Sequence, residues 1–521
     1  MRSFLHRYGL ILLTGLSLGY AFPRTGLFVL AWAGLIPLLA HTRGMSPLAG
    51  GKAFFLSGLT FYLVLLQWLM ANTYWAGGWA FVGYVLLSVV MAAYWGVFGM
   101  AWIWLRPALP RPLAWAIALP LLWAVMEALQ ARLFTGFGWG ALAYSQGANL
   151  PILQWAAVGG APLVAGFIVA VNGLLAQALL SRGRARYLHG AAALLLLAAT
   201  HGFGAQMLGE PRYNDAPFRV GVLQPNFSLE MKWDREYTVD MVENVAEKSL
   251  LLARTEPLDL FVWPEALVMA PIESPGVLRP IQRLAQETSA TVYTGAQRWN
   301  TDRGGSLNSS HLIREDGAVA GTYDKIRLAP FGEYVPLSDY IPFVQQVVPA
   351  IGDILPGATP KVFDVNGRQL GPLICFEALF PHMARRLRAE GADVLAVITN
   401  LGWFGATSAI EQELNISRLR AIETRLPLVH SANTGISGVF DPWGRFQLVD
   451  RVFTPDGSYR YLPDHIRPGQ TLKSRLGGVF DLPESEPLPL PGSQRAFPFL
   501  AAAIVAGLAV WRWRRLGLRP V

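Results

Sequence analysis

Three short motifs in the 521-residue chain contain side chains that together could transfer an acyl group. They are Trp-Pro-Glu265, Asp-Lys325-Ile and Ile-Cys375-Phe. A thiol with an ordinary pKa of about 8.5 attacks as a thiolate when a base removes its proton or a cation lies nearby. A carboxylate can act as that base, and an ammonium group can stabilise the oxyanion of a tetrahedral intermediate. These residue types therefore fit nucleophilic acyl transfer.

The elements that must position these motifs form an alternating pattern of strands and helices. We expect strands at 218–224, 258–263, 291–295, 371–375 and 394–400, and helices at 237–253, 277–288 and 409–425. Such alternation predicts a layered α/β domain. Because ligands of open α/β sheets bind outside the carboxyl ends of the strands, we expect the three motifs to converge there.

Taken singly, each of the three residues also has a purely structural interpretation. A cysteine after two apolar residues is commonly a small buried hydrophobe, as Cys375 could be. Glu265 could complement the dipole of a helix in its first turn, and Lys325 could be a solvated strand residue. The catalytic interpretation is favoured over these structural ones because a thiol, a carboxylate and an amine together form a complete set for acyl transfer.

The sequence gives no indication of metal or cofactor chemistry. It contains no HExxH, no GxxxxGK loop and no GxGxxG after a strand, and its eight histidines are scattered. A single cysteine excludes an intramolecular disulfide, a Cys-rich zinc module and a CxxC redox pair. We therefore expect neither a metal nor a cofactor.

The composition indicates a protein that lies partly in lipid. Hydrophobic residues make up 53% of the chain and charged residues 15%, against about 25% charged in a soluble domain. Long apolar runs lie at 7–22, 26–42, 53–72, 79–105, 112–131, 160–181, 187–206 and 496–512. A span needs about 20 apolar residues, so the first two runs are marginal. We expect a bundle of about eight transmembrane helices.

The charges divide the chain into three parts. Residues 1–210 contain 11 basic and two acidic residues, residues 211–490 contain 27 and 33, and residues 491–521 contain five and none. We therefore expect a seven-span bundle at 1–210, a folded catalytic domain at 211–490, and a last span with a basic tail at 491–521. The four prolines of 482–493 are typical of a linker. Because the middle part is slightly acidic, nucleic-acid binding is not expected.

Lysine and arginine near the span ends predict the orientation. With the N-terminus in the cytoplasm, inner segments hold thirteen basic residues and the short outer loops hold only Arg24 and Arg132. This places both termini in the cytoplasm and residues 211–490 outside it. The aromatic, glycine-rich segment 132–159 is expected to lie at the outer interface as an anchoring belt, or as a lipid entrance.

Longer motifs around the three residues resemble a known family. They are Trp263-Pro-Glu265, Lys325 followed by Pro330-Phe-Gly-Glu333-Tyr-Val-Pro, and Ile374-Cys375-Phe-Glu377. These resemble the Glu-Lys-Cys triad motifs of the nitrilase superfamily. Together with the membrane spans, the chain resembles, over essentially its whole length, the bacterial apolipoprotein N-acyltransferases. The resemblance implies an αββα nitrilase-like domain on the transmembrane bundle.

The resemblance also implies a role for each matching residue. Cys375 would be the nucleophile, Glu265 the general base and Lys325 the group that stabilises the oxyanion. Further family positions match the supporting acids Glu333 and Glu377, and the residues Trp233, Trp403 and Asn400 near the substrate cleft. Two departures are Phe376, where the family often has a tyrosine, and Leu401, where it commonly has an aspartate.

The activity implied is lipoprotein maturation at the bacterial inner membrane, with the catalytic domain on the periplasmic side. A phospholipid, such as phosphatidylethanolamine, would acylate Cys375 as a thioester. The second substrate would be the α-amino group of the S-diacylglyceryl cysteine of an apolipoprotein, which predicts ping-pong kinetics. Protection of the thioester from water suggests an apolar cleft whose loops, around Pro336 and Trp403, close during turnover. A monomer is expected.

Two alternatives remain at this point. The first is a membrane-anchored nitrilase-type amidase, which would use the same triad on a small extracytoplasmic amide. The second is a non-enzymatic membrane receptor or transporter with an extracytoplasmic domain. It predicts ionisable residues within the spans, whereas the spans contain almost none beyond Glu127 and His201.

Overall fold

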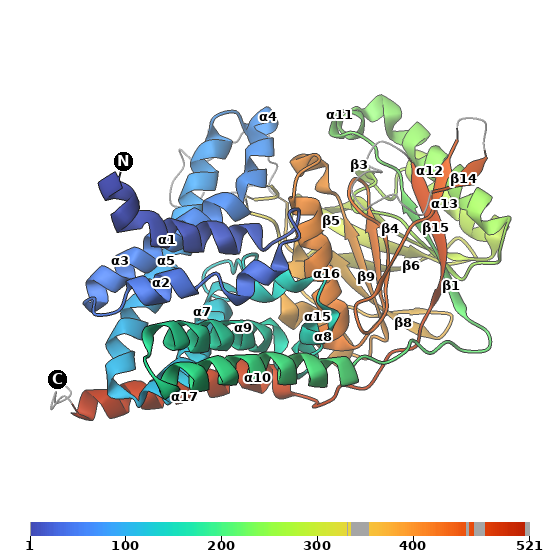
Figure 1. The fold of residues 1–521 in the computed structure, drawn as a ribbon. Helices are drawn as coiled ribbons and strands as arrows, with labels where there is room; N and C mark the ends of the chain where they lie inside the picture. Colours follow the sequence, from blue (N-terminus) through green and yellow to red (C-terminus); the bar gives the residue numbers. More distant parts are fainter. Residues whose placement is uncertain (1, 331, 335–353, 455–457, 463–474, 516–521) are drawn as a thin grey trace. The chain divides into compact units, whose positions relative to one another are not determined.

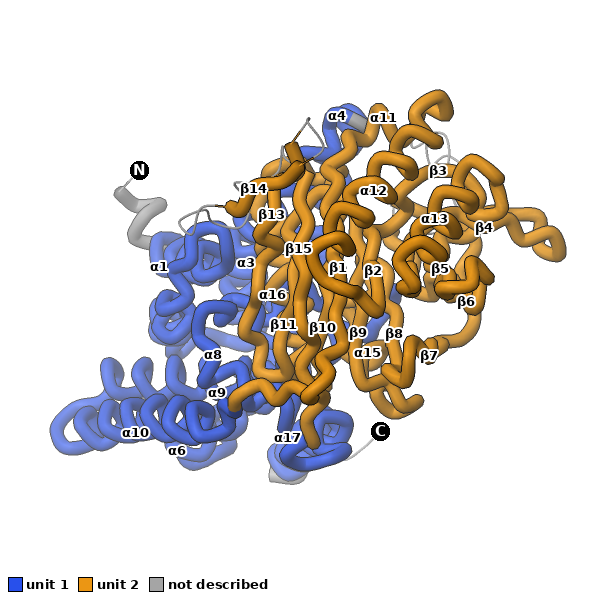
Figure 2. Tube along the Cα trace, turned by 90° about the vertical axis from the view of Figure 1, so that its right-hand side faces the viewer, with its two compact units in different colours: residues 1–209, 488–521 blue, residues 210–487 orange. Residues whose placement is uncertain are grey.

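The computed structural model describes residues 2–330, 332–334, 354–454, 458–462 and 475–515. The chain forms two compact units, one made of Met1–Gly209 with Leu488–Val521 and the other of Glu210–Pro487 (Figure 2). The first unit is helical and the second combines helices with two β-sheets (Figure 1).

In the helical unit, six described helices are long and apolar enough to cross a membrane. They are Pro47–Leu65, Trp79–Ala108, Arg111–Gln130, Ala156–Leu180, Arg184–Gln206 and Ser493–Trp513. The first two apolar runs of the sequence form shorter apolar helices, Tyr8–Tyr20 and Phe28–His41. The expected count of about eight therefore holds only if these two short helices are included.

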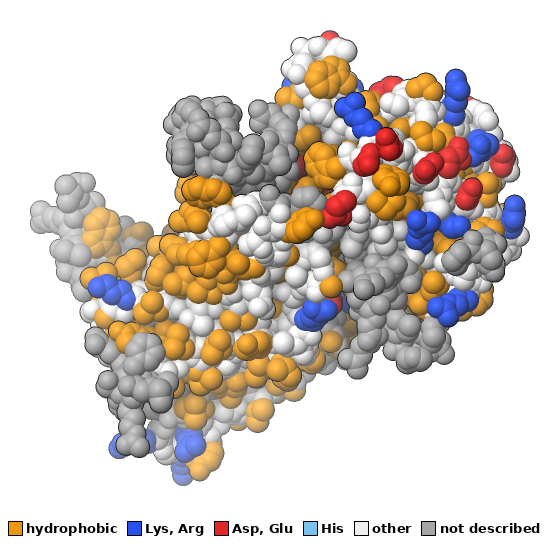
Figure 3. Space-filling model, turned by 90° about the horizontal axis from the view of Figure 1, so that it is seen from above, with side chains coloured by type: hydrophobic (Ala, Val, Ile, Leu, Met, Phe, Trp, Pro, Cys, Tyr) orange, Lys and Arg blue, Asp and Glu red, His pale blue; other side chains and the backbone are white. Residues whose placement is uncertain are grey.

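The helical unit has large apolar side chains both in its interior and on its surface. Trp95, Trp102 and Trp123 are fully buried, whereas Leu195 and Phe499 are 72% and 70% exposed. An apolar surface of this kind is stable in contact with lipid and costly in water. Figure 3 shows mainly hydrophobic side chains over this unit and groups of charged side chains over the other.

The segment 132–159, predicted to lie at the outer interface, packs largely inside the helical unit. Trp139 and Tyr144 are buried there, and only Phe134 of this segment is almost fully exposed. The preceding helix α7 (Leu119–Gln130) contacts the segment through its buried Glu127, which accepts a hydrogen bond from the backbone N–H of Leu142 at 2.9 Å. The position of the segment relative to the membrane interface stays a prediction.

The α/β unit contains two mixed sheets. The first has the order β14-β13-β15-β1-β2-β4-β5-β6, with β3 pairing to β4, and the second has the order β12-β11-β10-β9-β8-β7. The strands of the first sheet are β1 (Phe218–Gln224), β2 (Leu260–Val262), β3 (Val268–Pro271), β4 (Thr291–Asn300), β5 (Gly305–Ile313), β6 (Val319–Asp324), β13 (Arg451–Phe453), β14 (Tyr459–Tyr461) and β15 (Leu476–Leu482). Those of the second are β7 (Phe363–Val365), β8 (Arg368–Ile374), β9 (Val394–Thr399), β10 (Leu428–Ala432), β11 (Gly438–Phe440) and β12 (Phe446–Leu448).

The central strands of both sheets are parallel, which places several loops at a common edge. In the first sheet β1, β2 and β4 run parallel, and in the second β8, β9 and β10 do. Their carboxyl ends lead directly into the segments that hold Glu265, Cys375 and Asn400. The edge strands are antiparallel, and β6 ends immediately before Lys325.

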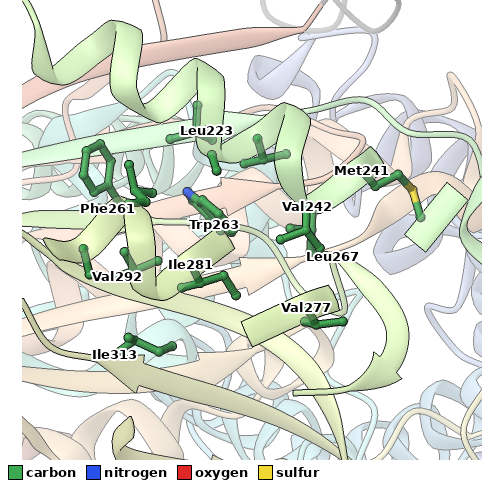
Figure 4. Packing of buried hydrophobic residues seen from close by; sticks show 14 of the residues in the cluster. Leu223, Met241, Val242, Phe261, Trp263, Leu267, Val277, Ile281, Val292 and Ile313 are labelled. Carbon is green, nitrogen blue, oxygen red and sulfur yellow. The ribbon is translucent and has the colours of Figure 1, made fainter. Parts of the chain in front are cut away.

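The layers are αββα, as the resemblance implied. Helices α12 (Thr238–Ala253) and α13 (Pro275–Thr288) pack on the first sheet, and α15 (Pro381–Ala389) and α16 (Ala409–Thr424) on the second. Buried aliphatic residues of facing strands, such as Val222 and Ile398, form the core between the sheets. A second core lies under α12 and α13 around Trp263 (Figure 4).

Candidate active site

The three residues singled out from the sequence lie at the ends of strands in the α/β unit. Glu265 follows β2, Lys325 directly follows β6, and Cys375 directly follows β8. Cys375 begins the 3-10 helix η7 (Cys375–Leu379) and has a φ of 51°, in the left-handed region that side chains other than glycine rarely adopt. Such a strained turn at the end of a strand is a feature of functional sites.

Lys325 lies between two carboxylates. Its Nζ is 2.9 Å from Oε1 of Glu265 and 3.0 Å from Oε2 of Glu333, and its side chain is only 2% exposed. The amide of Asn308 donates to both carboxylates, at 2.9 Å to Glu265 and 2.6 Å to Glu333. This network fixes the positions of three charged groups away from water.

The two carboxylates control the charge of Lys325. Burial alone would lower the pKa of Lys325, but the carboxylates of Glu265 and Glu333 raise that pKa well above its usual value. The ammonium group is therefore charged at every physiological pH. It is a fixed positive charge, suited to stabilise an oxyanion that forms beside it.

The thiol of Cys375 is partly buried and electrostatically coupled to this network. Burial raises the pKa of Cys375, the carboxylate of Glu265 raises it further, and the ammonium of Lys325 opposes both. The resting thiol is therefore protonated at neutral pH. It needs a base to become a nucleophile, and Glu265 is the carboxylate that acts on it most strongly.

Glu377 links the Cys375 turn to the segment that follows Lys325. Its fully buried carboxylate accepts hydrogen bonds from the Tyr323 hydroxyl at 2.7 Å and the backbone N–H of Ile326 at 2.7 Å. Its other oxygen accepts from the N–H of Ile374 at 2.9 Å. Glu377 therefore contacts the backbone next to Lys325 and the backbone next to Cys375, whereas Glu333 contacts the Lys325 side chain directly.

The residues expected near the substrate cleft lie in adjoining loops. Trp233 and Trp403 meet edge to face, with ring centroids 6.4 Å apart, and Trp233 is 49% exposed. Asn400 is buried, and its side-chain oxygen accepts from Nδ2 of Asn433 at 3.1 Å and from the N–H of Gly402 at 3.3 Å. The tryptophans can contact a substrate, while Asn400 shapes the loop that carries Trp403.

The two departures from the family pattern have simple surroundings. Phe376 packs edge to face on Phe380, with ring centroids 5.3 Å apart. Its ring therefore has an apolar neighbour, and a tyrosine at this position would add a polar hydroxyl group. Leu401 is buried, with 2% of its surface exposed. Parts of the specific motif, Phe331 and Val335-Pro336, lie outside the described residues, as does the loop expected to close around Pro336.

Several residues of the site were not found from the sequence. Asn308 lies within β5, Lys232 in the short helix α11 (Leu229–Trp233), and Glu413 in α16. They are recognised as site residues only by their proximity to the network in space. The one signal in the sequence is that Lys232 directly precedes Trp233. Among the described residues, no group of three or more His, Cys, Asp or Glu side chains could hold a metal ion.

Two family profiles match the chain, one in each unit. The profile described as "Apolipoprotein N-acyltransferase N-terminal domain" matches residues 14–174, and that described as "Carbon-nitrogen hydrolase" matches residues 219–450. A solved structure of an amidase from Nesterenkonia sp. is 20% identical, with a TM-score of 0.37 over 53% of this chain and 93% of the amidase.

Curated relatives match most of the chain. The apolipoprotein N-acyltransferase of Geobacter metallireducens is 34% identical over 491 residues, which cover 91% of this chain and 92% of that protein. The protein of the same name from Gloeobacter violaceus is 30% identical over 457 residues, covering 83% of each chain. That from Pseudomonas aeruginosa is 33% identical over 358 residues, or 66% of this chain and 68% of the relative.

Proposed function

The chain belongs to the apolipoprotein N-acyltransferase family, and from this premise we propose that it transfers a fatty acyl chain from a phospholipid to the N-terminal amine of a diacylglyceryl apolipoprotein. The observation that best supports this mechanism is the buried network in which Lys325 contacts Glu265 and Glu333 beside the Cys375 turn. It supplies a base, a fixed cation and a nucleophile in one place.

In the first half-reaction, Glu265 takes the thiol proton of Cys375. The thiolate attacks an ester carbonyl of the phospholipid, and the ammonium of Lys325 stabilises the oxyanion. Collapse of the intermediate breaks the ester C–O bond, and the glycerol alkoxide takes the proton from Glu265 as the lysophospholipid leaves. The product is a thioester on Cys375, and the carboxylate is restored.

In the second half-reaction, the α-amino group of the apolipoprotein attacks the thioester carbon. Glu265 accepts the proton that the nitrogen loses, and Lys325 again stabilises the oxyanion. The C–S bond breaks, the thiolate of Cys375 takes the proton from Glu265, and the N-acylated lipoprotein leaves. The two substrates react in separate steps, which is ping-pong kinetics.

The remaining residues have supporting roles in this proposal. Glu333 orients Lys325, with its Oε2 3.0 Å from Nζ, and Glu377 fixes the two backbone segments that carry Lys325 and Cys375. Trp233 and Trp403 contribute apolar surface to the acyl-chain cleft, with Asn400 holding the Trp403 turn. No cofactor takes part in these steps.

The proposed location is the inner membrane, with the α/β unit in the periplasm and both termini in the cytoplasm. The thirteen basic residues assigned to inner segments and the six apolar helices support this orientation. A periplasmic catalytic unit would meet phospholipids such as phosphatidylethanolamine and apolipoproteins at the outer leaflet. The proposed working form is a monomer of about 57.1 kDa.

The test is the intact mass of the full-length protein after incubation with phosphatidylethanolamine. We expect an acyl-sized increment on the wild type that neutral hydroxylamine removes and that Cys375→Ser lacks. Transfer of the acyl chain to a diacylglyceryl peptide should then restore the original mass. An unmodified mass while the peptide is nevertheless acylated would contradict the thioester, and hydrolysis of small amides without any lipid acylation would favour an amidase.

A further inference from the structure

A second lysine is buried beside the proposed base. Lys232 is 3% exposed, although lysine is almost never fully buried without a partner. Among the described residues, its Nζ has one hydrogen-bond acceptor, the backbone oxygen of Glu265, at 3.5 Å. This distance is at the long limit for a hydrogen bond, so the ammonium group is incompletely satisfied.

The short helix α11 fixes Lys232 in this position. Ser228 caps the helix, its hydroxyl accepting from the N–H of Met231 at 3.3 Å. On one side Leu229 packs so closely on Gly402 that a Cβ added there would lie 3.3 Å from it. On the other, Lys232 reaches the Glu265 backbone. The helix that carries Lys232 therefore contacts both the Glu265 loop and the Gly402 turn.

The charges of the network show what a second cation could do. The carboxylates of Glu265 and Glu333 share the single ammonium of Lys325, which leaves one negative charge in excess. Lys232 provides the second positive charge, and Glu265 is the charged group that acts on it. The other charged group that acts on the thiol from a packed element is Glu413 of α16, which raises the pKa of Cys375.

We propose that Lys232 is a positioning residue that acts through Glu265: it holds the loop of this carboxylate and adds a second positive charge to the network at neutral pH, which favours removal of the Cys375 proton. The inference rests on the proposed function in taking Glu265 as the base for Cys375. A positive charge favours the anionic form of nearby groups, so the ammonium of Lys232 offsets the excess negative charge that opposes formation of the thiolate. Its hydrogen bond to the backbone also fixes the loop that carries Glu265.

The charge of Lys232 is itself limited to a range of pH. Burial lowers the pKa of Lys232 to about 8, although the carboxylate of Glu265 opposes the shift. The ammonium is therefore present at neutral pH and is lost as the pH rises above about 8. A lysine that merely filled space would have no reason to lie where its charge must be desolvated, because methionine would fill the same volume at lower cost.

The single cysteine makes a direct test possible. Because Cys375 is the only cysteine of the chain, the pH dependence of alkylation by iodoacetamide reports on this thiol alone. We would compare the full-length wild type in detergent with Lys232→Met and Lys232→Arg. The matched control is Lys361→Met, which removes an exposed lysine whose Nζ bonds the backbone oxygen of Thr322 at 2.8 Å.

The expected result is slower alkylation at neutral pH for one variant only. Lys232→Met should react about tenfold more slowly than the wild type at pH 7, where the wild-type ammonium is present, and this difference should disappear as the pH rises above about 8. Lys232→Arg keeps the charge and should keep the wild-type rate at pH 7, as should Lys361→Met. A thermal unfolding scan of each variant shows that it is folded, and if the methionine variant is not, the arginine variant decides: a wild-type rate at pH 7 supports the inference.

Two outcomes would overturn the inference. One is a Lys232→Met rate that is lowered by the same factor at every pH, or not lowered at all, which would make Lys232 a structural residue. The other is a Lys232→Arg rate at pH 7 as low as that of the methionine variant. Alkylation needs no lipid, so this result is independent of the acyl-enzyme test. An acylated wild type together with Lys232 variants that react at the wild-type rate would contradict the role of Lys232 and leave the proposed function intact.

Discussion

The two units of the molecule bury ionisable side chains in different ways. In the helical unit Glu127 is buried by itself, and its Oε1 accepts from Nε1 of Trp123 at 2.8 Å and from the N–H of Leu142 at 2.9 Å. In the α/β unit, Glu265, Lys325 and Glu333 are buried together and contact one another. The isolated carboxylate accepts from one side chain and one backbone N–H, whereas the group contains carboxylates and an ammonium that are electrostatically coupled to the thiol of Cys375.

This difference shows which buried charges to associate with chemistry. Glu127 accepts both of its hydrogen bonds through one oxygen, so we expect its acceptor atom to matter more than its charge. A network in which two acids share a cation makes each charge depend on the others, and removing one leaves the rest unpaired. The comparison is tested most simply by making the same substitution in both units.

The largest effect is expected for Glu265→Gln. The glutamine retains an oxygen that can accept from Lys325 and Asn308, but it cannot take the proton of Cys375. General base catalysis contributes about 10²–10⁴ in rate, so thioester formation should fall by that factor. Timed intact-mass measurements with phospholipid give the rate of thioester formation, and Cys375→Ser gives the background rate. A rate within twofold of the wild type would show that another group is the base.

A smaller effect is expected for Glu377→Gln, which tests a buried acid that acts on structure within the catalytic unit. The new NH₂ group must face either the N–H of Ile374 or the N–H of Ile326, so at least one hydrogen bond is lost. Loss of one such bond costs about 1–3 kcal/mol, and loosening of the turn should lower the acylation rate about tenfold.

The measurement for Glu377→Gln combines thermal unfolding with the rate of acylation. The matched control is Glu390→Gln, whose carboxylate forms an exposed pair with Arg386 four residues earlier and should change stability by less than about 0.5 kcal/mol. If both variants behave alike, Glu377 does not hold the two segments together.

Lys232→Met should make the protein more stable while it impairs the site. In the folded chain the pKa of Lys232 is about 8, below its ordinary 10.5, so charging the buried group costs free energy at neutral pH. Methionine removes this cost, which amounts to about 3 kcal/mol. The advantage should be complete below about pH 8 and shrink as the pH rises toward 10.5, because the wild-type lysine is then neutral in both states.

Melting temperatures of the two proteins at pH 7 and pH 9.5 measure this advantage. A smaller difference in melting temperature between the two proteins at pH 9.5 than at pH 7 agrees with this expectation. A variant that melts below the wild type at pH 7 would show instead that the Lys232 contact with Glu265 stabilises the fold more than burial destabilises it.

The sequence was sufficient to predict the layers and the segments that hold the proposed triad, for identifiable reasons. The strands β1, β8 and β9 are mostly apolar because most of their residues are buried, and the ends of β8 and β9 locate Cys375 and Asn400. Strands β5 (Gly305–Ile313) and β6 (Val319–Asp324) were missed because their sequences are largely polar, although β5 is mostly buried and only β6 is partly exposed. Lys325 was therefore found from its motif and not from its strand.

The parts of the site that could not be predicted depend on contacts between distant segments. Asn308 joins two carboxylates that lie 43 and 25 residues away in the chain. Lys232 contacts a backbone oxygen 33 residues away. Neither asparagine in a strand nor lysine in a short helix has a local pattern that distinguishes a site residue from a surface residue. The fold alone brings them to the base.

The smallest effect is expected for Glu127→Gln in the helical unit, the counterpart of Glu265→Gln. The glutamine oxygen can accept from Trp123 and Leu142 as the carboxylate does, and no cation is left without its partner. The melting temperature should change little, with less than about 0.5 kcal/mol of stability lost, and the acylation rate should stay within twofold. Glu127→Ala, which removes the acceptor, should in contrast lower stability by about 1–3 kcal/mol. A large loss of acylation in Glu127→Gln would mean that the isolated acid of the helical unit takes part in the chemistry, and the distinction between single and grouped buried charges would then fail for this protein.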